Sequence, residues 1–586
     1  MYVPRHLTAA MLFLAAGLFA QTDFYPLGDV KPGTHGTGRT VFSGDRIEEF
    51  DVEILGVLDN VGPKQSLILG RLSGGPLAKT GVMQGMSGSP VFIGGKLAGA
   101  VAMAFPFATE AIAGIRPIQD MLRVNAASSE PVTRASVSLT DTDLTRLFPK
   151  PAQISTGDAK MIDIATPVSF GGFTQSAIER FSPQLRSLGL EPRQGVTAGG
   201  RVDPHMGDPA KLKPGSMISV QLMSGDMSVG ADGTVTWIDG RRIYAFGHRF
   251  LAVGATAMPF ARAEVLTLLP NLNSSFKVST ARELMGTILQ DRNSAVSGEL
   301  GMQADMVPVS VAVLRGGRPL DSYQMRMVRD SLLSPLLVQM AVFSTIDATE
   351  RTVGASSFRV SGDMEFQGAA APIHLDNMFA SDNGSAMQAS LSAAIPLAYI
   401  LQSGFDALKL SKVAISIESY DAKKQLQIDR VVSSKRTVRP GEEIEIGTVL
   451  AGDNGVEITR QNRYRVPIGA EPGQLYFTVA DANTTNLTEF RQLLTSSPKS
   501  VGQLVSTVNS LRTNTKAYIR VWRADTAYQV EGGDLPDPPP SVSLVLAQPA
   551  AGSILQTRNS KVAELEISAG QMMISGSKTI QVEVKE

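Results

Sequence analysis

The chain has 586 residues, with 54 lysines and arginines against 55 aspartates and glutamates, and a formal net charge of −1. This balance excludes the basic face typical of nucleic-acid-binding proteins, so we expect no nucleic-acid partner. The sequence contains no cysteine, which excludes disulfides and a cysteine-linked lipid anchor. Hydrophobic residues make up 43% of the chain, enough for sizeable cores, and the length predicts roughly three to five structural units.

The first twenty residues have the pattern of a secretory signal peptide. Arg5 and His6 are followed by the apolar stretch Leu7–Phe19 and then by the small residue Ala20. This stretch is too short to cross a bilayer, and no other apolar run approaches the length of a membrane span. We therefore expect residues 1–20 to be a signal peptide and the protein to be exported, either to a bacterial periplasm or outside the cell.

The run Gly85-Met86-Ser87-Gly88-Ser89-Pro90 carries the strongest chemical signal, and the apolar strand Val91–Ile93 follows it. Two-barrel serine peptidases present their nucleophile in this way, as a serine between glycines on a tight turn. Gly85 lets its own N–H and that of Ser87 point at one oxygen, the donor pair of an oxyanion hole. The alternative is a plain Gly/Ser turn between two strands.

A nucleophilic serine needs a base, and the best candidate is His248. It follows the apolar strand Ile243–Phe246 and Gly247, which places an imidazole at a strand end beside a gap. For any single histidine, a structural role is the alternative. The sequence has no HExxH, CxxC or Walker motif, so we expect neither a metal nor another cofactor.

These motifs resemble the SpoIVB peptidases, a family of serine peptidases named for a stage IV sporulation protein. The resemblance to the serine-bearing half runs from Phe50–Ile54 through Gly81–Pro90 to Gly114–Ile118, and that to the histidine-bearing half from Gly233–Ile238 through Phe246–His248 to Met285–Leu300. It implies a chymotrypsin-like fold and endopeptidase activity on a protein or peptide substrate. Ser87 would then be the nucleophile and His248 the general base.

The chain departs from the family in two respects. Ser87 precedes His248, the reverse of the family's order, so the halves either pair within one chain or are exchanged between two copies in a homodimer. The segment that holds the family's acid reads Leu72-Ser73-Gly74-Gly75-Pro76 and has no carboxylate. Asp291, at the end of an apolar strand, is the candidate for an orienting acid. Asp239 fits a hairpin turn better, and a Ser–His dyad is the other alternative.

The predicted fold class is mainly β: a two-barrel serine peptidase with permuted halves, a helical connector and a C-terminal immunoglobulin-like sandwich. Alternating strands and turn signals give the expected units. These are the serine-bearing barrel (21–124), a connector with a helix (125–213), the histidine-bearing barrel (214–368), a mixed region with buried helices (369–425), a sandwich with a helix (426–530), and a proline-rich linker with terminal strands (531–586).

Three functions fit these observations. The first is an exported serine endopeptidase, for which Phe105 and Phe107 are candidate residues of a substrate pocket because they follow the strand after Ser87. The second is a peptidase fold without catalysis that serves as a binding scaffold of the cell envelope, which the missing acid favours. The third is an esterase of another fold, which the absence of a G-x-S-x-G motif disfavours.

Overall fold

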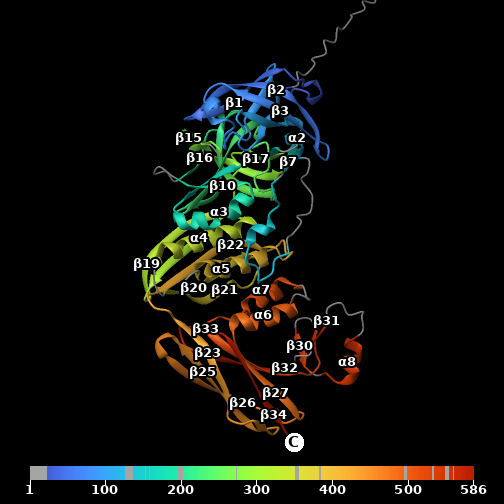
Figure 1. The fold of residues 1–586 in the computed structure, drawn as a ribbon, viewed down its shortest axis with the longest axis vertical. Coiled ribbons are helices and arrows are strands. Elements are labelled where there is room, and N and C mark those ends of the chain that lie inside the picture. The colour runs from blue at the N-terminus through green and yellow to red at the C-terminus, as the bar shows by residue number, and fades with distance from the viewer. Residues whose placement is uncertain are drawn as a thin grey trace, which may run out of the picture.

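The computed structural model describes residues 23–586 except 126–135, 152, 157–158, 196–201, 272, 350–355, 382–384, 494–497, 531–532, 537, 548–553 and 558–559. The predicted signal peptide therefore lies outside the described residues. Figure 1 shows an elongated molecule whose chain runs from a barrel at one end, through a second barrel and a helical layer, to a β-sandwich at the other end. The fold is mainly β, as the sequence predicts.

Six strands close the first barrel in the order β4-β1-β2-β3-β6-β5, because β4 also pairs with β5. Along β2, Phe50, Val52 and Ile54 are buried while Asp51 is exposed, the alternation of a half-buried strand. The short helix α1 (Leu77–Thr80) and the run around Ser87 connect β3 to β4. The six strands are β1 (His35–Ser43), β2 (Arg46–Gly62), β3 (Gln65–Ser73), β4 (Pro90–Ile93), β5 (Lys96–Ala104) and β6 (Ile112–Pro117).

The second barrel is also closed and six-stranded. Its order is β13-β14-β17-β16-β15-β12, and the pairing of β12 with β13 completes the ring. His248 lies just after β14, between β14 and β15. The strands are β12 (Met217–Gly225), β13 (Ser228–Asp239), β14 (Arg242–Ala245), β15 (Gly254–Leu269), β16 (Phe276–Arg292) and β17 (Ala295–Leu300). Two facing barrels are the chymotrypsin-like arrangement, here with the serine-bearing barrel first in the chain.

The segment between the barrels is built into both of them. Helix α2 (Ile118–Leu122) follows the first barrel, and β7 (Gln153–Thr156) and β8 (Ala159–Asp163) extend its sheet beyond β5. Strands β9 (Thr166–Gly171) and β10 (Leu190–Gln194) extend the sheet of the second barrel from β13, with helix α3 (Gln175–Ser187) between them. Strand β11 (Asp203–Met206) pairs with β16. The predicted connector is thus largely strand, with the expected helix.

Beyond the second barrel the same sheet continues from β12 through β19, β18, β22, β20 and β21. The predicted boundary at residue 368 falls inside the β20–β21 hairpin, whose two strands pair residue by residue. Helix α4 packs against α3, α5, β18 and β19, and nearly all its residues are buried, which suits a helix that is apolar on every side. The elements are β18 (Met306–Arg315), β19 (Arg318–Val328), α4 (Leu333–Thr349), β20 (Ser356–Gln367), β21 (Ile373–Ser381), α5 (Ser385–Leu401) and β22 (Lys409–Tyr420).

The C-terminal part is a two-sheet sandwich with its own core, to which Leu426, Ile444, Phe477 and Val582 contribute. The terminal strands β32, β33 and β34 pair into these two sheets, so residues 560–584 complete the sandwich and are not a separate unit. One sheet contains β26 (Glu457–Arg465), β25 (Glu443–Gly452), β23 (Gln425–Ser433) and β33 (Met573–Ser575), and the other β24 (Thr437–Val438), β34 (Ser577–Val584), β27 (Gly473–Asp481), β28 (Lys516–Arg523) and β32 (Ser560–Ser568).

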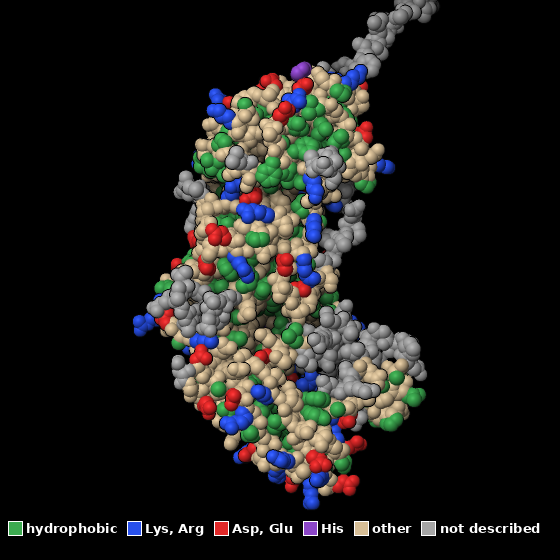
Figure 2. Space-filling view, viewed as in Figure 1, with side chains coloured by type: hydrophobic (Ala, Val, Ile, Leu, Met, Phe, Trp, Pro, Cys, Tyr) green, Lys and Arg blue, Asp and Glu red, His purple; other side chains and the backbone are tan. Residues whose placement is uncertain are grey.

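Smaller elements surround this sandwich. Helices α6 (Ala482–Leu493) and α7 (Val501–Asn509) lie between β27 and β28, and β29 (Ala527–Val530), β30 (Gly533–Pro536) and β31 (Ile554–Thr557) form a small sheet next to α8 (Pro540–Leu546). Among the helices of the described residues, none is long and apolar enough to cross a membrane. Figure 2 shows acidic and basic side chains interspersed over the visible face.

The sandwich is attached to the edge strand β21 by side chains that take the place of a neighbouring strand. Asn514 is buried, its Oδ1 accepts from the Met378 N–H (2.6 Å), and its Nδ2 donates to the Met378 carbonyl. The Thr513 hydroxyl donates to the Asp376 carbonyl (2.6 Å). These bonds satisfy main-chain groups that an edge strand would otherwise leave unpaired.

We predict that Asn514→Ala loosens the sandwich from the sheet and lowers the free energy of unfolding by about 1–3 kcal/mol, because the Met378 N–H and carbonyl lose their partners. Urea denaturation, with limited proteolysis between residues 421 and 425, measures this. Asn462→Ala removes only an exposed bond to the Glu566 carbonyl and is the control. Equal stability and proteolysis of the two variants would contradict the prediction.

Candidate active site

The serine loop, defined here as residues 84–89, is held against the second barrel by its carbonyl groups. The Thr234 N–H donates to the Ser87 carbonyl (2.9 Å), and the Thr234 hydroxyl donates to the Gly85 carbonyl (2.9 Å). The Thr236 hydroxyl donates to the Gly88 carbonyl (2.7 Å). Thr234 and Thr236 are alternate residues of β13, so their hydroxyls share one face of the strand. These two hydroxyls and one main-chain N–H together bind three carbonyls of the loop.

With its carbonyls turned toward β13, the serine loop has two amides available. The Gly88 N–H donates to the Val101 carbonyl (2.8 Å) and the Met86 N–H to the Met83 carbonyl (3.1 Å). The N–H groups of Gly85 and Ser87 find no acceptor within the described part of the chain. These two amides are the donor pair that the sequence predicts for an oxyanion hole.

Glycine is required at two positions of the loop. Gly85 (φ +90°) and Gly88 (φ +92°) both have left-handed backbone conformations. A Cβ on Gly88 would overlap the Thr234 carbonyl oxygen and lie 2.5 Å from the Phe246 nitrogen. The loop therefore touches both β13 and the end of β14 at the position next to Ser87.

The turn after β14 places Gly247, the residue before His248, next to the Val101 carbonyl that the serine loop also contacts. Phe246 (φ +70°) and Gly247 (φ +68°) turn the chain sharply, and a Cβ on Gly247 would lie 3.2 Å from the Val101 oxygen, the same carbonyl that accepts from Gly88. A positive φ is unusual for phenylalanine and indicates a conformation imposed by the surroundings. Ser87 and His248, which belong to separate barrels, are thus each adjacent in sequence to a glycine that lies next to the Val101 carbonyl.

Both candidate catalytic residues are buried and carry an unpaired reactive atom. Ser87 is 0% exposed and His248 is 1% exposed. The Ser87 Oγ and the His248 Nε2 have no hydrogen-bond partner in the described residues. The His248 Nδ1 lies 2.5 Å from the Arg249 carbonyl oxygen. A carbonyl only accepts, so Nδ1 carries the proton and a neutral imidazole has its free lone pair on Nε2.

The structure places Asp291 behind His248 but not on its imidazole. The Asp291 carboxylate accepts from the N–H groups of Phe250 (2.8 Å), Leu251 (2.8 Å) and Val253 (3.2 Å). Burial raises the pKa of Asp291 to about 6, and these three bonds oppose the rise. Asp291 therefore fixes the turn that follows His248. Asp239 lies opposite Arg242 in the β13–β14 hairpin, as its sequence context indicates.

A carboxylate that the sequence did not single out lies within electrostatic reach of His248. Asp163 ends β8, and its Oδ1 is buried without a partner among the described residues. Burial lowers the pKa of His248, the nearby charge of Asp163 raises it, and Arg116 lowers it. The only sequence signal was one acid in the strand pattern Met161-Ile162-Asp163-Ile164, within the segment we took as a connector.

The candidate pocket residues Phe105 and Phe107 line a cavity of about 660 Å³ that also includes Gln84 and Asp163. Phe107 is 75% exposed and has a φ of +61°. An exposed aromatic ring on a strained backbone is uncommon in a purely structural loop. The cavity borders the serine loop at Gln84, the residue before Gly85.

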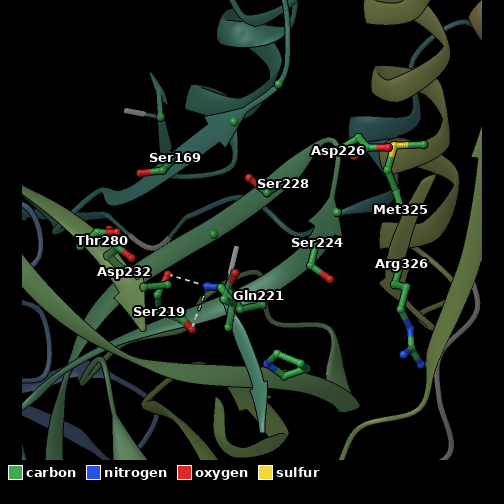
Figure 3. Close-up of a pocket in the computed structure, with 18 of the residues that line it drawn as sticks. Ser169, Ser219, Gln221, Ser224, Asp226, Ser228, Asp232, Thr280, Met325 and Arg326 are labelled. Atoms are coloured by element: carbon green, nitrogen blue, oxygen red, sulfur yellow. Dashed lines mark hydrogen bonds between the residues drawn. The ribbon is translucent and has the colours of Figure 1, made fainter. Parts of the chain in front are cut away.

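A second cavity, of about 700 Å³, lies along β12 and β13 and is lined mainly by small polar side chains (Figure 3). At its wall the hydroxyls of Ser219 and Ser279 donate to the carboxylate of the buried Asp232. Burial raises the pKa of Asp232 to about 6. Lys277, also buried and near Asp232, has its pKa lowered to about 7. Within the described ranges, no group of three or more His, Asp and Glu side chains could hold a metal ion.

Lys277 connects this wall to the serine loop. Its Nζ donates to the Thr40 Oγ1 (2.7 Å), which also accepts from the Ser89 Oγ (3.0 Å). A Cβ on Gly85 would lie 3.2 Å from the Lys277 Cδ. The loop is therefore supported on one side by β13 and on the other by a buried lysine, which sequence reasoning did not identify.

The comparisons with known proteins bear on the first barrel. Residues 27–122 match the family model of the SpoIVB peptidase S55 family. This segment contains Ser87, so the resemblance of the serine-bearing half is confirmed, and His248 lies outside it. No curated protein and no solved structure matches the chain.

We predict that Gly88→Ala lowers the free energy of unfolding by about 3 kcal/mol or more, since a Cβ there adds steric overlap to a left-handed φ that already costs about 1–3 kcal/mol. Chemical denaturation gives the value. Gly94→Ala is the matched control, because Gly94 also has a positive φ (+55°) but open space around its Cβ position. We expect this control to cost only about 1–2 kcal/mol. Equal losses in both variants would mean that the loop does not pack against Thr234 as described.

Proposed function

Because residues 27–122 match the family model of the SpoIVB peptidase S55 family, we propose that this protein is an exported serine endopeptidase with Ser87 as nucleophile and His248 as general base. The observation that carries the proposal is that Ser87 Oγ and His248 Nε2 are each buried without a partner among the described residues, not bonded to each other, while the adjacent Gly88 and Gly247 both lie next to the Val101 carbonyl. A buried polar atom without a partner is rare and calls for a functional reason.

In the proposed reaction the Ser87 Oγ attacks the carbonyl carbon of a peptide bond, and its proton passes to the His248 Nε2. The developing oxyanion accepts from the N–H groups of Gly85 and Ser87. The C–N bond then breaks as the imidazolium returns its proton to the leaving amine. Water, deprotonated by the same nitrogen, hydrolyses the acyl-enzyme and restores the Ser87 hydroxyl.

Two carboxylates assist His248 in different ways. Asp163 supplies a negative charge that stabilises the imidazolium formed during the reaction. Asp291 acts through the main chain: it holds residues 250–253, and this keeps the adjacent Arg249 carbonyl against Nδ1. In this form of the proposal the group that orients the imidazole is a carbonyl, so a Ser–His pair suffices for proton transfer.

The cavity lined by Phe105 and Phe107 is the proposed substrate pocket, and its aromatic walls favour an apolar side chain of a peptide. In the structure both barrels belong to one chain, so the site needs no exchange of halves between two copies, and a homodimer stays a prediction. Export, to a periplasm or outside the cell, rests on the pattern of residues 1–20 and is part of the proposal.

The second candidate function is a binding scaffold without catalysis. Its support is the complete burial of Ser87 and His248, at 0% and 1% exposure, because a peptide carbonyl must reach both. In such a scaffold the fold is kept, but Ser87 and His248 stay buried and inaccessible to a peptide. The two functions differ in whether Ser87 reacts.

We predict that a fluorophosphonate probe labels Ser87 of the full-length chain, with its phosphorus bonded to Oγ and fluoride released. Ser87→Ala abolishes labelling, and His248→Ala slows it by at least about 10²-fold because the base is lost. Mass spectrometry of the adduct identifies the residue. Ser66→Ala is the control, since it removes only an exposed hydrogen bond to Asp59 in the same barrel. A folded protein without an adduct, or with one elsewhere, would overturn the peptidase and leave the scaffold.

We also predict the pH dependence of the labelling rate. Burial lowers the pKa of His248 from its ordinary 6.5, so the imidazole stays neutral and active below that pH, and the acid limb has its midpoint below 6.5. Asp163→Asn removes a charge that raises this pKa, so the midpoint moves to still lower pH. Asp291 itself titrates near pH 6, so Asp291→Asn lowers the rate and removes that second step from the acid limb, while the midpoint of the His248 step stays where it is. A midpoint that Asp163→Asn leaves unchanged, or shifts upward, would contradict the role of Asp163.

A further inference from the structure

An arginine beside the serine loop, Arg193, forms no ion pair with a carboxylate among the described residues. Arg193, in β10, donates from Nη2 to the Gln84 Oε1 (3.0 Å), and its guanidinium lies over the Phe276 ring, 3.3 Å from the ring centre. Its Nε is buried and has no acceptor among the described residues. Burial lowers the pKa of Arg193, the charge of Glu191 raises it, and the charge of Arg186 lowers it.

Other arginines of this chain use the same edge of the guanidinium to bind a carboxylate. Arg186 donates from Nε and Nη2 to Glu191 at 3.0–3.3 Å. Arg359 does the same to Asp376, and Arg512 to Glu564. On Arg193 the Nη2 donor of this edge binds the neutral amide oxygen of Gln84, and the Nε donor has no acceptor among the described residues. Glu191, two residues away, is already bound to Arg186.

The position of Arg193 connects it to the proposed substrate site. Its partner Gln84 directly precedes Gly85, and the Gln84 main chain is fixed by bonds to Ser275 (2.9 Å) and Lys277 (3.2 Å). Gln84, Glu191 and Ser275 all line the cavity that contains Phe105 and Phe107. Arg193 itself is not among the residues that line this cavity, so a group reaches its Nε–Nη2 edge by displacing the side chain of Gln84, the residue before the proposed oxyanion donor Gly85.

We propose that Arg193 is a carboxylate-binding residue of the substrate groove, and this rests on the proposed function. A carboxylate of the bound peptide, from an acidic side chain or a free C-terminus, replaces the Gln84 amide oxygen and accepts from Nε and Nη2 together. Paired charge-assisted bonds are shorter and stronger than one bond to a neutral amide. While no peptide is bound, the Gln84 side chain occupies the Nε–Nη2 edge of Arg193. The proposed substrates are peptides with a carboxylate near the cleaved bond.

Peptide binding to Ser87→Ala protein tests this, because that variant cannot turn over its ligand. The probes are fluorescein-labelled octapeptides rich in Leu and Phe, with Asp at one position in turn, each paired with its Asn counterpart. A second set compares a free C-terminal acid with its amide. Fluorescence anisotropy gives the dissociation constants, and the two sets distinguish the two sources of the carboxylate.

We expect at least one acidic peptide to bind about tenfold or more tightly than its neutral counterpart, in line with a charge-assisted pair. In the Ser87→Ala/Arg193→Gln protein the ratio falls to about one. Arg180→Gln removes an exposed arginine charge of α3 outside the cavity and leaves the ratio intact. Gln84→Ala frees the edge and keeps or increases the ratio, whereas a purely structural tie between Arg193 and Gln84 predicts that Gln84→Ala and Arg193→Gln act alike.

Equal binding of acidic and neutral peptides in both sets, or a preference that survives Arg193→Gln, would overturn the proposal. Such a result leaves the peptidase standing if the fluorophosphonate probe still labels Ser87. Conversely, an Arg193-dependent preference in a protein whose Ser87 does not react supports the carboxylate site and overturns the endopeptidase.

Discussion

Three hydrogen bonds from β13 to the carbonyls of the serine loop organise the candidate site, two from threonine hydroxyls and one from a main-chain N–H. Thr234 and Thr236 bind the carbonyls of Gly85, Ser87 and Gly88, which leaves the N–H groups of Gly85 and Ser87 without acceptors. The same contact requires glycine at position 88, because Thr234 and the Phe246 backbone leave no space for a Cβ. The second barrel thus fixes the conformation of the serine loop of the first barrel. The turn after Phe246 places Gly247, the residue before His248, against the first barrel at the Val101 carbonyl.

The layer between the barrels contains several buried polar groups around the serine loop, and burying such groups is costly unless each has a partner. Lys277, Thr40 and Ser89 satisfy one another on one side of the loop, and Asp232 is bonded by serine hydroxyls. Buried networks of this kind specify one geometry, since any shift leaves a charge or a hydroxyl unpaired. Ser87, His248, Asp163 and Arg193 are among the described residues that each have a buried side-chain atom without a partner. These four residues carry the two proposals.

Short local patterns made part of this site predictable. The glycines around Ser87 and the strand before Gly247-His248 are local features, and the first segment also carries the family resemblance. The strand alternation at Phe50–Ile54 likewise predicted its buried face. Asp163 and Arg193 could not be found in the same way. Each lies in a segment that looks like an ordinary connector, and its significance depends on a contact with a distant residue, His248 or Gln84. The pairing of β32–β34 into the sandwich depends in the same way on partners far apart in the chain.

The most direct test of the central claim, that Ser87 and His248 form a working catalytic pair, is cleavage itself. The full-length protein and its Ser87→Ala variant would be incubated with a complex mixture of denatured bacterial proteins, and new termini identified by mass spectrometry. The account predicts new termini with the unchanged protein, enriched in apolar residues at the cut and in nearby carboxylates, and none with Ser87→Ala. The same termini with both proteins, or none with either while both remain folded, would contradict it.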